Sequence, residues 1–298
     1  MLGQQILNGL SLGCVYALVA LGYSMVYGML RLLNFAHGDV LMVGAFAGWG
    51  VLAAIGGSVG AAGQLGLAAL AAALVAGLIG AGVERFAYRP VLPLGRLAPL
   101  VSALGASIVL RSAAALLTGG RSKVVSTAGL LGTDSLAVGG LWLSPVGLLV
   151  IATTGALLVG LDWLCRKTPY GRRMRAVSHD PGAAELAGVD VRRVVGQTFW
   201  LGSVLAGVAG LLVAMYYTQV DFQMGFSLGL KAFVAAVLGG IGQMWGAVLG
   251  GLALGVAESL GVAVFGSVYK DLTAFVVLIL VLSLRPQGIV DVGGGRRA

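Results

Sequence analysis

Residues 166–193 read R-K-T-P-Y-G-R-R-M-R-A-V-S-H-D-P-G-A-A-E-L-A-G-V-D-V-R-R, a polar island between two long apolar runs. The island holds seven of the 19 lysines and arginines in a chain of 298 residues of which only 10% are charged. Clusters of basic residues beside apolar runs are typical of the cytoplasmic loops of membrane proteins. The island therefore predicts which side of a membrane this part of the chain faces, and the flanking runs are predicted to cross it.

The island contains the signals of one short helix. Asp180 is a favourable N-cap, Pro181 fits the first helical position and Gly188 is a C-terminal stop. Small and apolar residues fill the two turns between them. Because a helix of two turns is marginal alone in water, we expect it to dock against another surface. We interpret this short helix as the contact through which a cytoplasmic partner moves a membrane protein.

The composition supports an all-α polytopic transmembrane bundle. Hydrophobic residues make up 58% of the chain, with 50 glycines and a mean hydropathy of +0.98. The apolar runs do not alternate, which excludes a transmembrane β-barrel. Although the net charge is +8, the basic residues lie in loops beside apolar runs, so we expect membrane lipid and not nucleic acid as the partner. Cys14 and Cys165 have no disulfide or metal-binding spacing.

About eight or nine membrane helices are expected within a single membrane domain, residues 1–298, some of them re-entrant or broken at glycine. The continuous spans are predicted at about 5–30, 64–83, 97–117, 141–164, 195–216 and 272–284. The basic loop 84–96, with Arg85, Arg89 and Arg96, and the tail with Arg296 and Arg297 should lie on the side of residues 166–193. The weakly charged loop 119–140 should lie on the other. The first span is interpreted as a membrane helix and not a cleaved signal, and the side of its N-terminus stays open.

A polar break, R-L-L-N-F-A-H-G-D-V at 31–40, separates the first span from the next apolar run. Asn34 and His37 lie in this break. It is either an ordinary loop or the unwound part of a discontinuous or re-entrant helix, where freed backbone groups face a substrate path.

A second break carries the glycines of G-G-I-G, after a short apolar piece that contains Lys231. Gly-interrupted half-helices recur where membrane transporters bind their substrates. We therefore predict a substrate path at both breaks; its residues are Asn34, His37, Lys231, Gly239, Gly240 and Gly242. Two basic residues within apolar runs have a simpler alternative: Arg111, and Lys231 as well, could extend to the membrane surface as snorkelling side chains.

Enzyme motifs are absent from the sequence. There is no G-x-x-x-x-G-K-[ST], H-E-x-x-H or G-x-S-x-G, and His37 and His179 have no cysteines to complete a zinc site. We therefore expect no catalytic residues, no metal and no cofactor of the chain's own. A carrier whose transport is driven by a separate energy-supplying protein fits these features best. A proton-coupled carrier would need titratable groups within spans, for which Glu258 alone is slender support, and a non-transporting scaffold would not need broken helices.

Several motifs are long and unusual in composition: N-G-L-S-L-G-C-V-Y-A-L-V-A-L-G at 8–22, N-F-A-H-G-D at 34–39, G-R-R-M-R-A at 171–176, A-A-E-L-A-G-V at 183–189 and K-A-F-V-A-A-V-L-G-G-I-G at 231–242. In these motifs, and nearly end to end, the chain resembles one known family, the LivH-type permeases of bacterial branched-chain amino acid importers.

This resemblance implies a multi-pass permease subunit of an ATP-binding cassette (ABC) importer in the bacterial inner membrane. It implies a second, LivM-like permease, two cytoplasmic P-loop ATPases that bind the ATP, and a periplasmic protein that delivers leucine, isoleucine or valine. Permeases for urea, amides or other amino acids share the same motifs, so these substrates remain alternatives.

The resemblance also implies that residues 166–193 are the coupling loop seated on an ATPase. The residues that match the family pattern there are Gly171, Arg172, Arg175, Ala176, Asp180, Ala183, Ala184 and Gly188. From the residues themselves, Ala183, Ala184 and Gly188 leave room for a partner, and Arg172, Arg173 and Arg175 would pair with its acidic groups. Replacing Ala184 with arginine is accordingly expected to uncouple transport from ATP hydrolysis.

Overall fold

A computed structural model of the chain describes residues 2–56, 59–95, 97–132, 135–138, 140–285 and 288–289. Among these residues, eight helices are long and apolar enough to cross a membrane, and one more apolar helix is shorter. The expected all-α polytopic bundle is confirmed. The long helices are α1 (Leu2–Leu30), α2 (His37–Ile55), α3 (Ala61–Gly82), α4 (Leu97–Thr118), α6 (Pro145–Lys167), α9 (Val191–Tyr216), α11 (Met244–Phe265) and α12 (Lys270–Leu284), and the shorter one is α10 (Met224–Gly239). Helix α12 reaches membrane length together with the 3-10 turn Ser267–Tyr269 that precedes it.

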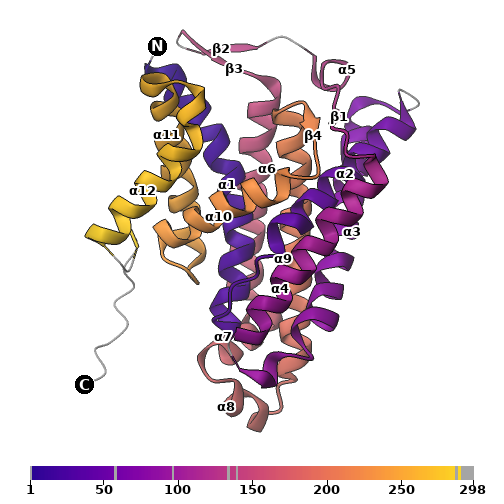
Figure 1. Cartoon of the computed structure of the whole chain (residues 1–298), viewed down its shortest axis with the longest axis vertical. Helices are drawn as coiled ribbons and strands as arrows, with labels where there is room; N and C mark the ends of the chain where they lie inside the picture. Colours follow the sequence, from indigo (N-terminus) through magenta and orange to yellow (C-terminus); the bar gives the residue numbers. More distant parts are fainter. Residues whose placement is uncertain are drawn as a thin grey trace.

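Short elements cover the two ends of the bundle. At one end lie α7 (Pro169–His179) and α8 (Pro181–Leu186), which we call the α8 end (Figure 1). At the other lie α5 (Ala128–Leu131) and two small antiparallel sheets, which we call the β4 end. The sheets pair β1 (Lys123–Val124) with β4 (Gln219–Val220), and β2 (Leu136–Val138) with β3 (Leu141–Leu143). Gln4 exchanges hydrogen bonds with the backbone of Trp142 in β3, which places the start of α1 at the β4 end.

Helix α1 is the centre of the bundle, and glycines let α11 pack closely against it. A Cβ atom added to Gly9 would lie 2.7 Å from the Cα of Val256, and one added to Gly13 would lie 2.8 Å from the Cα of Leu252. The run Val15–Leu21 is fully buried. The G-x-x-x-G spacing of α1 thus sets the contact between the first and one of the last helices, as small residues do between membrane helices.

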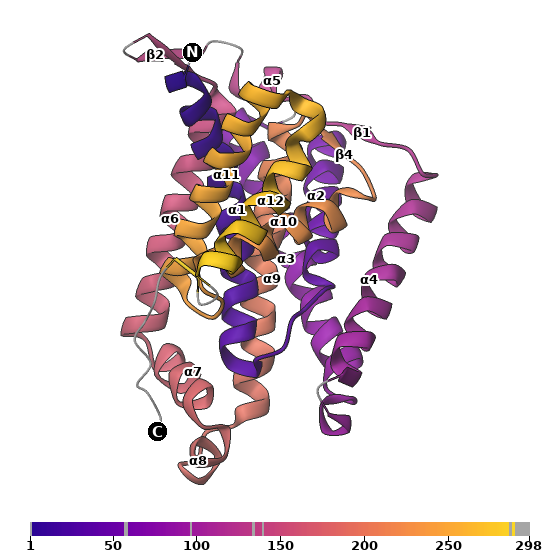
Figure 2. The same ribbon diagram turned by 60° about the vertical axis from the view of Figure 1, so that its left-hand side comes forward.

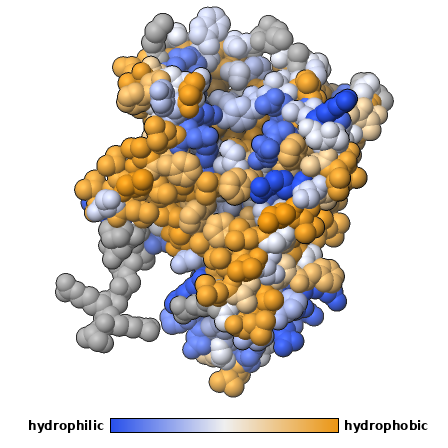
Figure 3. Space-filling model, in the orientation of Figure 1, coloured by the Kyte–Doolittle hydropathy of each residue, from blue (hydrophilic) through white to orange (hydrophobic). Residues whose placement is uncertain are grey.

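Apolar side chains cover the middle of the molecule (Figure 3). Helix α4 presents Leu116 and Leu117 almost fully exposed, and α12 presents Val276 and Ile279. Such a belt is unstable in water but is the natural surface of a protein surrounded by lipid.

Two breaks interrupt the helical bundle. Residues 31–36 leave the α8-end terminus of α1 and run without helical structure to the start of α2 (Figure 2). Arg31 at the start of this segment is exposed, but Asn34 and Ala36 are buried, so the unwound chain enters the bundle before α2 begins. The second break, 240–243, separates α10 from α11. The prediction of a Gly-broken segment is confirmed at the second break, whereas the first break contains no glycine.

Two predicted boundaries were wrong. The span expected from residue 141 begins at Pro145, because Leu141–Leu143 pair with β2 and the Ser144 side chain caps the helix by accepting from the Gly147 N–H at 3.0 Å. The loop expected from residue 84 is helical at first, since a π-helical turn, Val83–Tyr88, extends α3 and the pair Arg89–Glu84 closes it at 3.0 Å. The α3–α4 junction does lie at the α8 end (Figure 2). Arg96, Arg296 and Arg297 lie outside the described residues.

Candidate functional site

Helix α8 forms by the signals read in the sequence. The Asp180 carboxylate accepts hydrogen bonds from the N–H groups of Gly182 and Ala183 at 2.9 and 3.1 Å, and Pro181 is the first helical residue. Gly188 has φ +81°, a conformation that glycine adopts without strain, and its N–H donates to the Glu185 carbonyl. Asp180 and Gly188 therefore shape this segment from within.

The segment α7–α8 is anchored to the bundle through the end of α6. Gly171 is buried, and a Cβ atom there would collide with the backbone of Cys165. Arg175 donates a hydrogen bond to the Cys165 carbonyl, which ties this arginine to its own chain. The Tyr170 hydroxyl is hydrogen-bonded to Thr198 of α9 at 2.7 Å, and burial raises the pKa of Tyr170 to about 12. The anchor is consequently a neutral phenol and a buried glycine contact.

The predicted coupling residues divide into an inward and an outward set. Ala184 is 4% exposed and packs in the chain's own apolar cluster, so the expectation that it leaves room for a partner was wrong. The outward face is instead marked by Leu186, an apolar side chain that is 93% exposed. Also exposed are Arg172, Arg173, Ala176, Ala183 and Gly188.

Asn34 and His37 lie inside the bundle at the first break. The Asn34 side-chain oxygen accepts from the Ala36 N–H at 3.1 Å and from the Tyr88 hydroxyl at 3.3 Å, which holds the unwound segment in place. The His37 ring stacks edge-on against Tyr23 at 4.7 Å, and its Nε2 atom is buried without a hydrogen-bond partner among the described residues. Asn34 thus has a structural task, and His37 is the more distinctive polar group.

The glycines of the second break have different roles. Gly239 lies directly against Gly246 of α11, where any side chain would collide with backbone, so it is a helix-packing residue. Gly240 and Gly242 have φ +101° and +89° and make the turn between α10 and α11. A Cβ atom on Gly242 would lie 3.5 Å from the Cα of Gly28 of α1. The break is therefore seated on the central helix.

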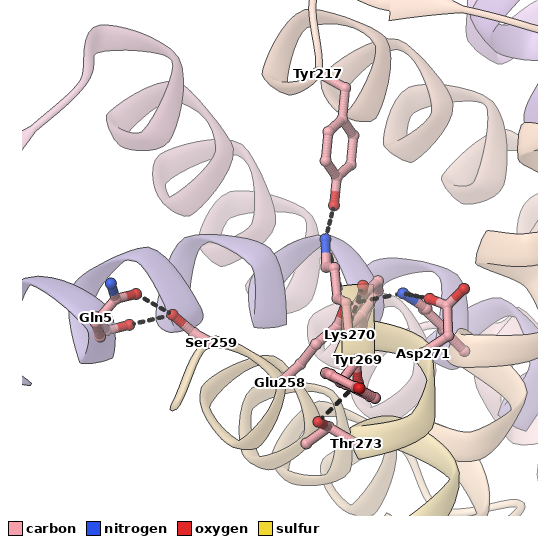
Figure 4. A network of polar contacts seen from close by, with 10 residues as sticks. Gln5, Tyr217, Glu258, Ser259, Tyr269, Lys270, Asp271 and Thr273 are labelled. Carbon is pink, nitrogen blue, oxygen red and sulfur yellow. Dashed lines mark hydrogen bonds and ion pairs between the residues drawn. The ribbon is translucent and has the colours of Figure 1, made fainter. Parts of the chain in front are cut away.

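A buried cluster of charges joins α10, α11 and α12 near the β4 end (Figure 4). The Lys231 ammonium lies 2.8 Å from Glu258 Oε1 and 2.6 Å from Asp271 Oδ1. Lys270 lies 3.3 Å from the same Glu258 oxygen and 2.6 Å from the Tyr217 hydroxyl. Because Lys231 is buried in an ion pair, the snorkelling alternative for it was wrong.

Glu258 is fully buried, and Tyr16 of α1 completes its partners by donating to Oε2 at 2.8 Å. A buried carboxylate is stable only when it is paired and hydrogen-bonded, and this one is both. The cluster therefore fixes the short helix α10 to the centre of the bundle.

A second pair, Asp39 with Arg111, joins α2 to α4. The two groups lie 3.4 Å apart, Ser107 also donates to Asp39, and the guanidinium lies over the Phe226 ring at 4.8 Å. Snorkelling of Arg111 was thus the wrong expectation, because its partner Asp39 lies 72 residues away and nothing in the sequence shows that the two side chains face each other. This ion pair is the polar link that holds the otherwise apolar α4 to the bundle.

Polar pockets lie at both ends of the helices that carry the breaks. The β4-end pocket, about 330 Å³, is lined by Tyr217, Asp221, Met224, Lys231, Lys270 and Asp271, among others. Hydrophilic residues line a hollow in the upper half of Figure 3. The α8-end pocket, about 290 Å³, is lined by Ser24, Gly28, Asp162, Met174, Gly242 and Trp245, among others. Lys231 belongs to the first pocket and Gly242 to the second, so α10 and the turn that follows it connect the two.

Three residues of the charge cluster, Lys270, Asp271 and Tyr217, were not predicted. Lys270 and Asp271 stand at the start of a predicted span, where charges are ordinary, so their sequence carried no distinguishing signal. Glu258 within an apolar run was a signal, because intramembrane carboxylates are rare, but its partner could not be read from one sequence.

A bundle of membrane-length helices with internal breaks and a polar pocket toward each end defines a multi-pass membrane transport protein. Residues 5–282 match the model of the family described as branched-chain amino acid transport system / permease component, and the chain belongs to this family.

Three relatives cover nearly the whole chain. The chain is 42% identical over 293 residues to the high-affinity branched-chain amino acid transport system permease protein BraD of Pseudomonas aeruginosa, which covers 96% of this chain and 95% of that protein. It is 39% identical over 299 residues to the permease protein LivH of the corresponding system in Escherichia coli K12, with 96% and 94% covered. The LivH protein of Salmonella typhimurium gives the same identity and coverage.

Proposed function

We propose that this chain is the membrane-spanning permease subunit of an ABC importer that moves branched-chain amino acids across the bacterial inner membrane. In this proposal residues 1–298 form one permease domain, and residues 166–193 are its cytoplasmic coupling loop. A second, LivM-like permease completes the path, two P-loop ATPases bind the ATP, and a periplasmic protein delivers the amino acid. The names of the relatives support the substrate class.

The observation that carries the proposal is the construction of the α7–α8 segment. It projects from the α8 end as a capped helix whose inner residue Ala184 is buried and whose tip residue Leu186 is 93% exposed. Arg172 and Arg173 are exposed beside it. A rigid apolar tip with a basic flank is suited to a groove in a partner with acidic groups around it, since buried apolar anchors dominate such contacts.

The broken helices support a path through this chain. Unwound backbone at membrane depth is tolerated where it is buried in protein or lines a cavity. Asn34 and Ala36 in the first break are of the first kind, and Gly242 in the second break lines the α8-end pocket. Together with the β4-end pocket, these features place a hollow toward each side of the membrane, which alternating access would open in turn.

The test is reconstitution of the chain with the permease, ATPase and binding-protein subunits encoded beside it. Vesicles that contain ATP are expected to accumulate radiolabelled leucine only when the binding protein is added. A matched preparation whose ATPases lack the P-loop lysine is expected to accumulate none. Competition by unlabelled isoleucine and valine, but not by urea, short amides or other amino acids, is expected. Competition by one of these other solutes instead would reject the branched-chain assignment.

A proton-coupled carrier is the second candidate, because the structure contains three buried carboxylates, Asp39, Glu84 and Glu258. Each is held by cations, however: Asp39 by Arg111, Glu84 by Arg89, and Glu258 by Lys231 and Lys270. A carboxylate tied to a basic side chain serves as a structural link, and removing one partner of such a buried pair is destabilising. Uptake by the purified chain alone, driven by a pH gradient and abolished by a protonophore, would support this candidate and reject the ABC proposal.

A further inference from the structure

The β4-end pocket combines features that an amino acid would need and that a surface hollow does not. Its volume of about 330 Å³ lies at the lower end of the range of about 300–1,000 Å³ for small-molecule sites. Its walls carry both signs of charge, from the lysines Lys231 and Lys270 and the aspartates Asp221 and Asp271. We propose that this pocket binds a free amino acid in its zwitterionic form. The proposal rests on the function proposed above and names a site for its substrate.

The deep part of the pocket is suited to the α-carboxylate. Lys231 and Lys270 both reach the same oxygen of Glu258, so two ammonium groups converge there on one carboxylate. Among the described residues each ammonium has two side-chain partners, and an ammonium has three N–H donors. One donor on each lysine therefore remains for a ligand, and both lysines line the pocket.

The rim of the pocket is suited to the α-ammonium. The Asp271 side chain is 66% exposed, and among the described residues its one ionic partner is Lys231, which contacts Oδ1. Asp221 also lines the pocket, and its Oδ1 accepts from the Gln223 N–H, which leaves its second oxygen free of partners among the described residues. Carboxylate oxygens at the rim and lysines below them match the order of charges in a zwitterion.

An apolar wall completes the site. Val213 of α9 and Met224 and Leu228 of α10 line the same pocket, and all three side chains are largely buried. An aliphatic side chain placed there would be removed from water, and because each buried CH₂ adds to the gain, the wall favours a branched aliphatic residue over a small one. An acidic side chain of a docked binding protein would satisfy the lysines but would leave this wall and the two aspartates without a role.

Protection of an introduced thiol tests the site directly. The permease complex with its ATPases is placed in liposomes with cysteine at Ser227, an exposed residue of the pocket wall; Cys14 and Cys165 are buried. Leucine at about ten times its Kd should slow labelling by an impermeant thiol reagent about tenfold, because protection follows 1 + [L]/Kd. Leucine methyl ester, which lacks the carboxylate, and 4-methylpentanoate, which lacks the ammonium, should not protect. Cysteine at Gln223 on the rim serves if the first variant does not fold.

Charge variants then identify the groups involved. Lys270→Met and Asp271→Asn should each abolish the protection by leucine. The matched control is Lys123→Met, which removes a lysine at the same end of the bundle; Lys123 lies over the Trp49 ring, outside the pocket, and protection should persist. Protection that survives in both pocket variants would overturn the assignment.

Uptake measured in the same vesicles, with the binding protein added, separates this proposal from the proposed function. Uptake of leucine without protection by leucine would overturn the site and keep the function. Protection by leucine without uptake would keep the site and overturn the function. Protection by another amino acid and not by leucine would keep a zwitterion site and reject the branched-chain substrate. Protection by the binding protein alone, with no effect of any amino acid, would overturn the site and make the pocket part of a docking surface.

Discussion

Replacing Leu186 with alanine should lower the affinity of the ATPase for the permease while the membrane bundle stays folded. The side chain is 93% exposed at the tip of α8, whereas Ala184, two residues earlier and on the opposite side of the helix, is buried in the chain's own apolar cluster. Truncating Leu186 therefore removes no packing inside the chain. Surface substitutions of this kind usually change stability by less than about 0.5 kcal/mol, so the melting temperature of the purified chain should not move.

The expected loss of affinity follows from the apolar area that Leu186 offers. Leucine exceeds alanine by three carbon groups, each worth about 0.8 kcal/mol when it is buried. Because the side chain is almost fully exposed before docking, the partner can bury nearly all of it, and the loss is about 2.4 kcal/mol. That corresponds to an ATPase affinity about 50-fold lower, since 1.4 kcal/mol is a factor of ten.

The assay is a titration of the ATPase subunit onto the permease pair in nanodiscs, read as bound ATPase and as stimulated ATP hydrolysis. The matched control is Leu116→Ala, which truncates a leucine that is 84% exposed on α4, away from the α8 end, and should leave binding unchanged. If Leu186→Ala and the control bind the ATPase equally well, α8 is not the docking element, and the coupling assignment of residues 166–193 fails.

Four further predictions concern the anchors of the fold. Ala184→Arg should destabilise the α7–α8 segment and lower the yield of folded protein, because the site is buried, and intact folding with lost ATPase binding would contradict this. Asp39→Asn should cost about 2–3 kcal/mol of thermal stability, less than the 3–5 of a fully buried pair because its partner arginine is 28% exposed. Gly171→Ala should cost about 1–3 kcal/mol by collision with the end of α6, whereas Gly160→Ala, with open space around it, should not. The pKa of the Tyr170 phenol is raised to about 12, from about 10 in the unfolded chain. Its contribution to folding stability is therefore complete below pH 10 and is lost as the pH rises toward 12. Protease resistance of the α7–α8 segment should fall between these two pH values, and it should fall less in Tyr170→Phe.

Features that depend on neighbouring residues in the sequence were predicted well. The cap, first proline and terminal glycine of α8 lie within nine residues and were each read correctly, because capping is decided by local backbone geometry. The membrane helices were found for a similar reason, since length and apolarity are properties of a single segment.

Features that depend on contacts across the chain were not predictable from one sequence. Arg111 was assigned to the membrane surface because its partner Asp39 is 72 residues away, and the sequence does not show that the two residues face each other. Lys231 and Glu258 were each noticed, yet their pairing needs the α10–α11 turn to bring them together. Ala184 was assigned to the partner face because a two-turn helix of small residues has no periodicity that distinguishes its sides. In each case the missing information was which helix faces which.

The contact between α1 and α11 has a consequence for how the protein is made. Helix α1 leaves the ribosome first, but Gly251 and Gly255, which pack against Ala17 and Gly13, are synthesised more than 230 residues later. At about 5–20 residues per second, translation leaves the glycine face of α1 without its closest neighbour for about 12–50 seconds. During that interval the Tyr16 hydroxyl of α1 lacks its hydrogen-bond partner, Glu258 of α11, because α11 has not yet been synthesised. The contact between the first helix and α11 therefore forms late in synthesis. A chain truncated before α11 should expose the glycine face of α1 to the insertion and quality-control machinery.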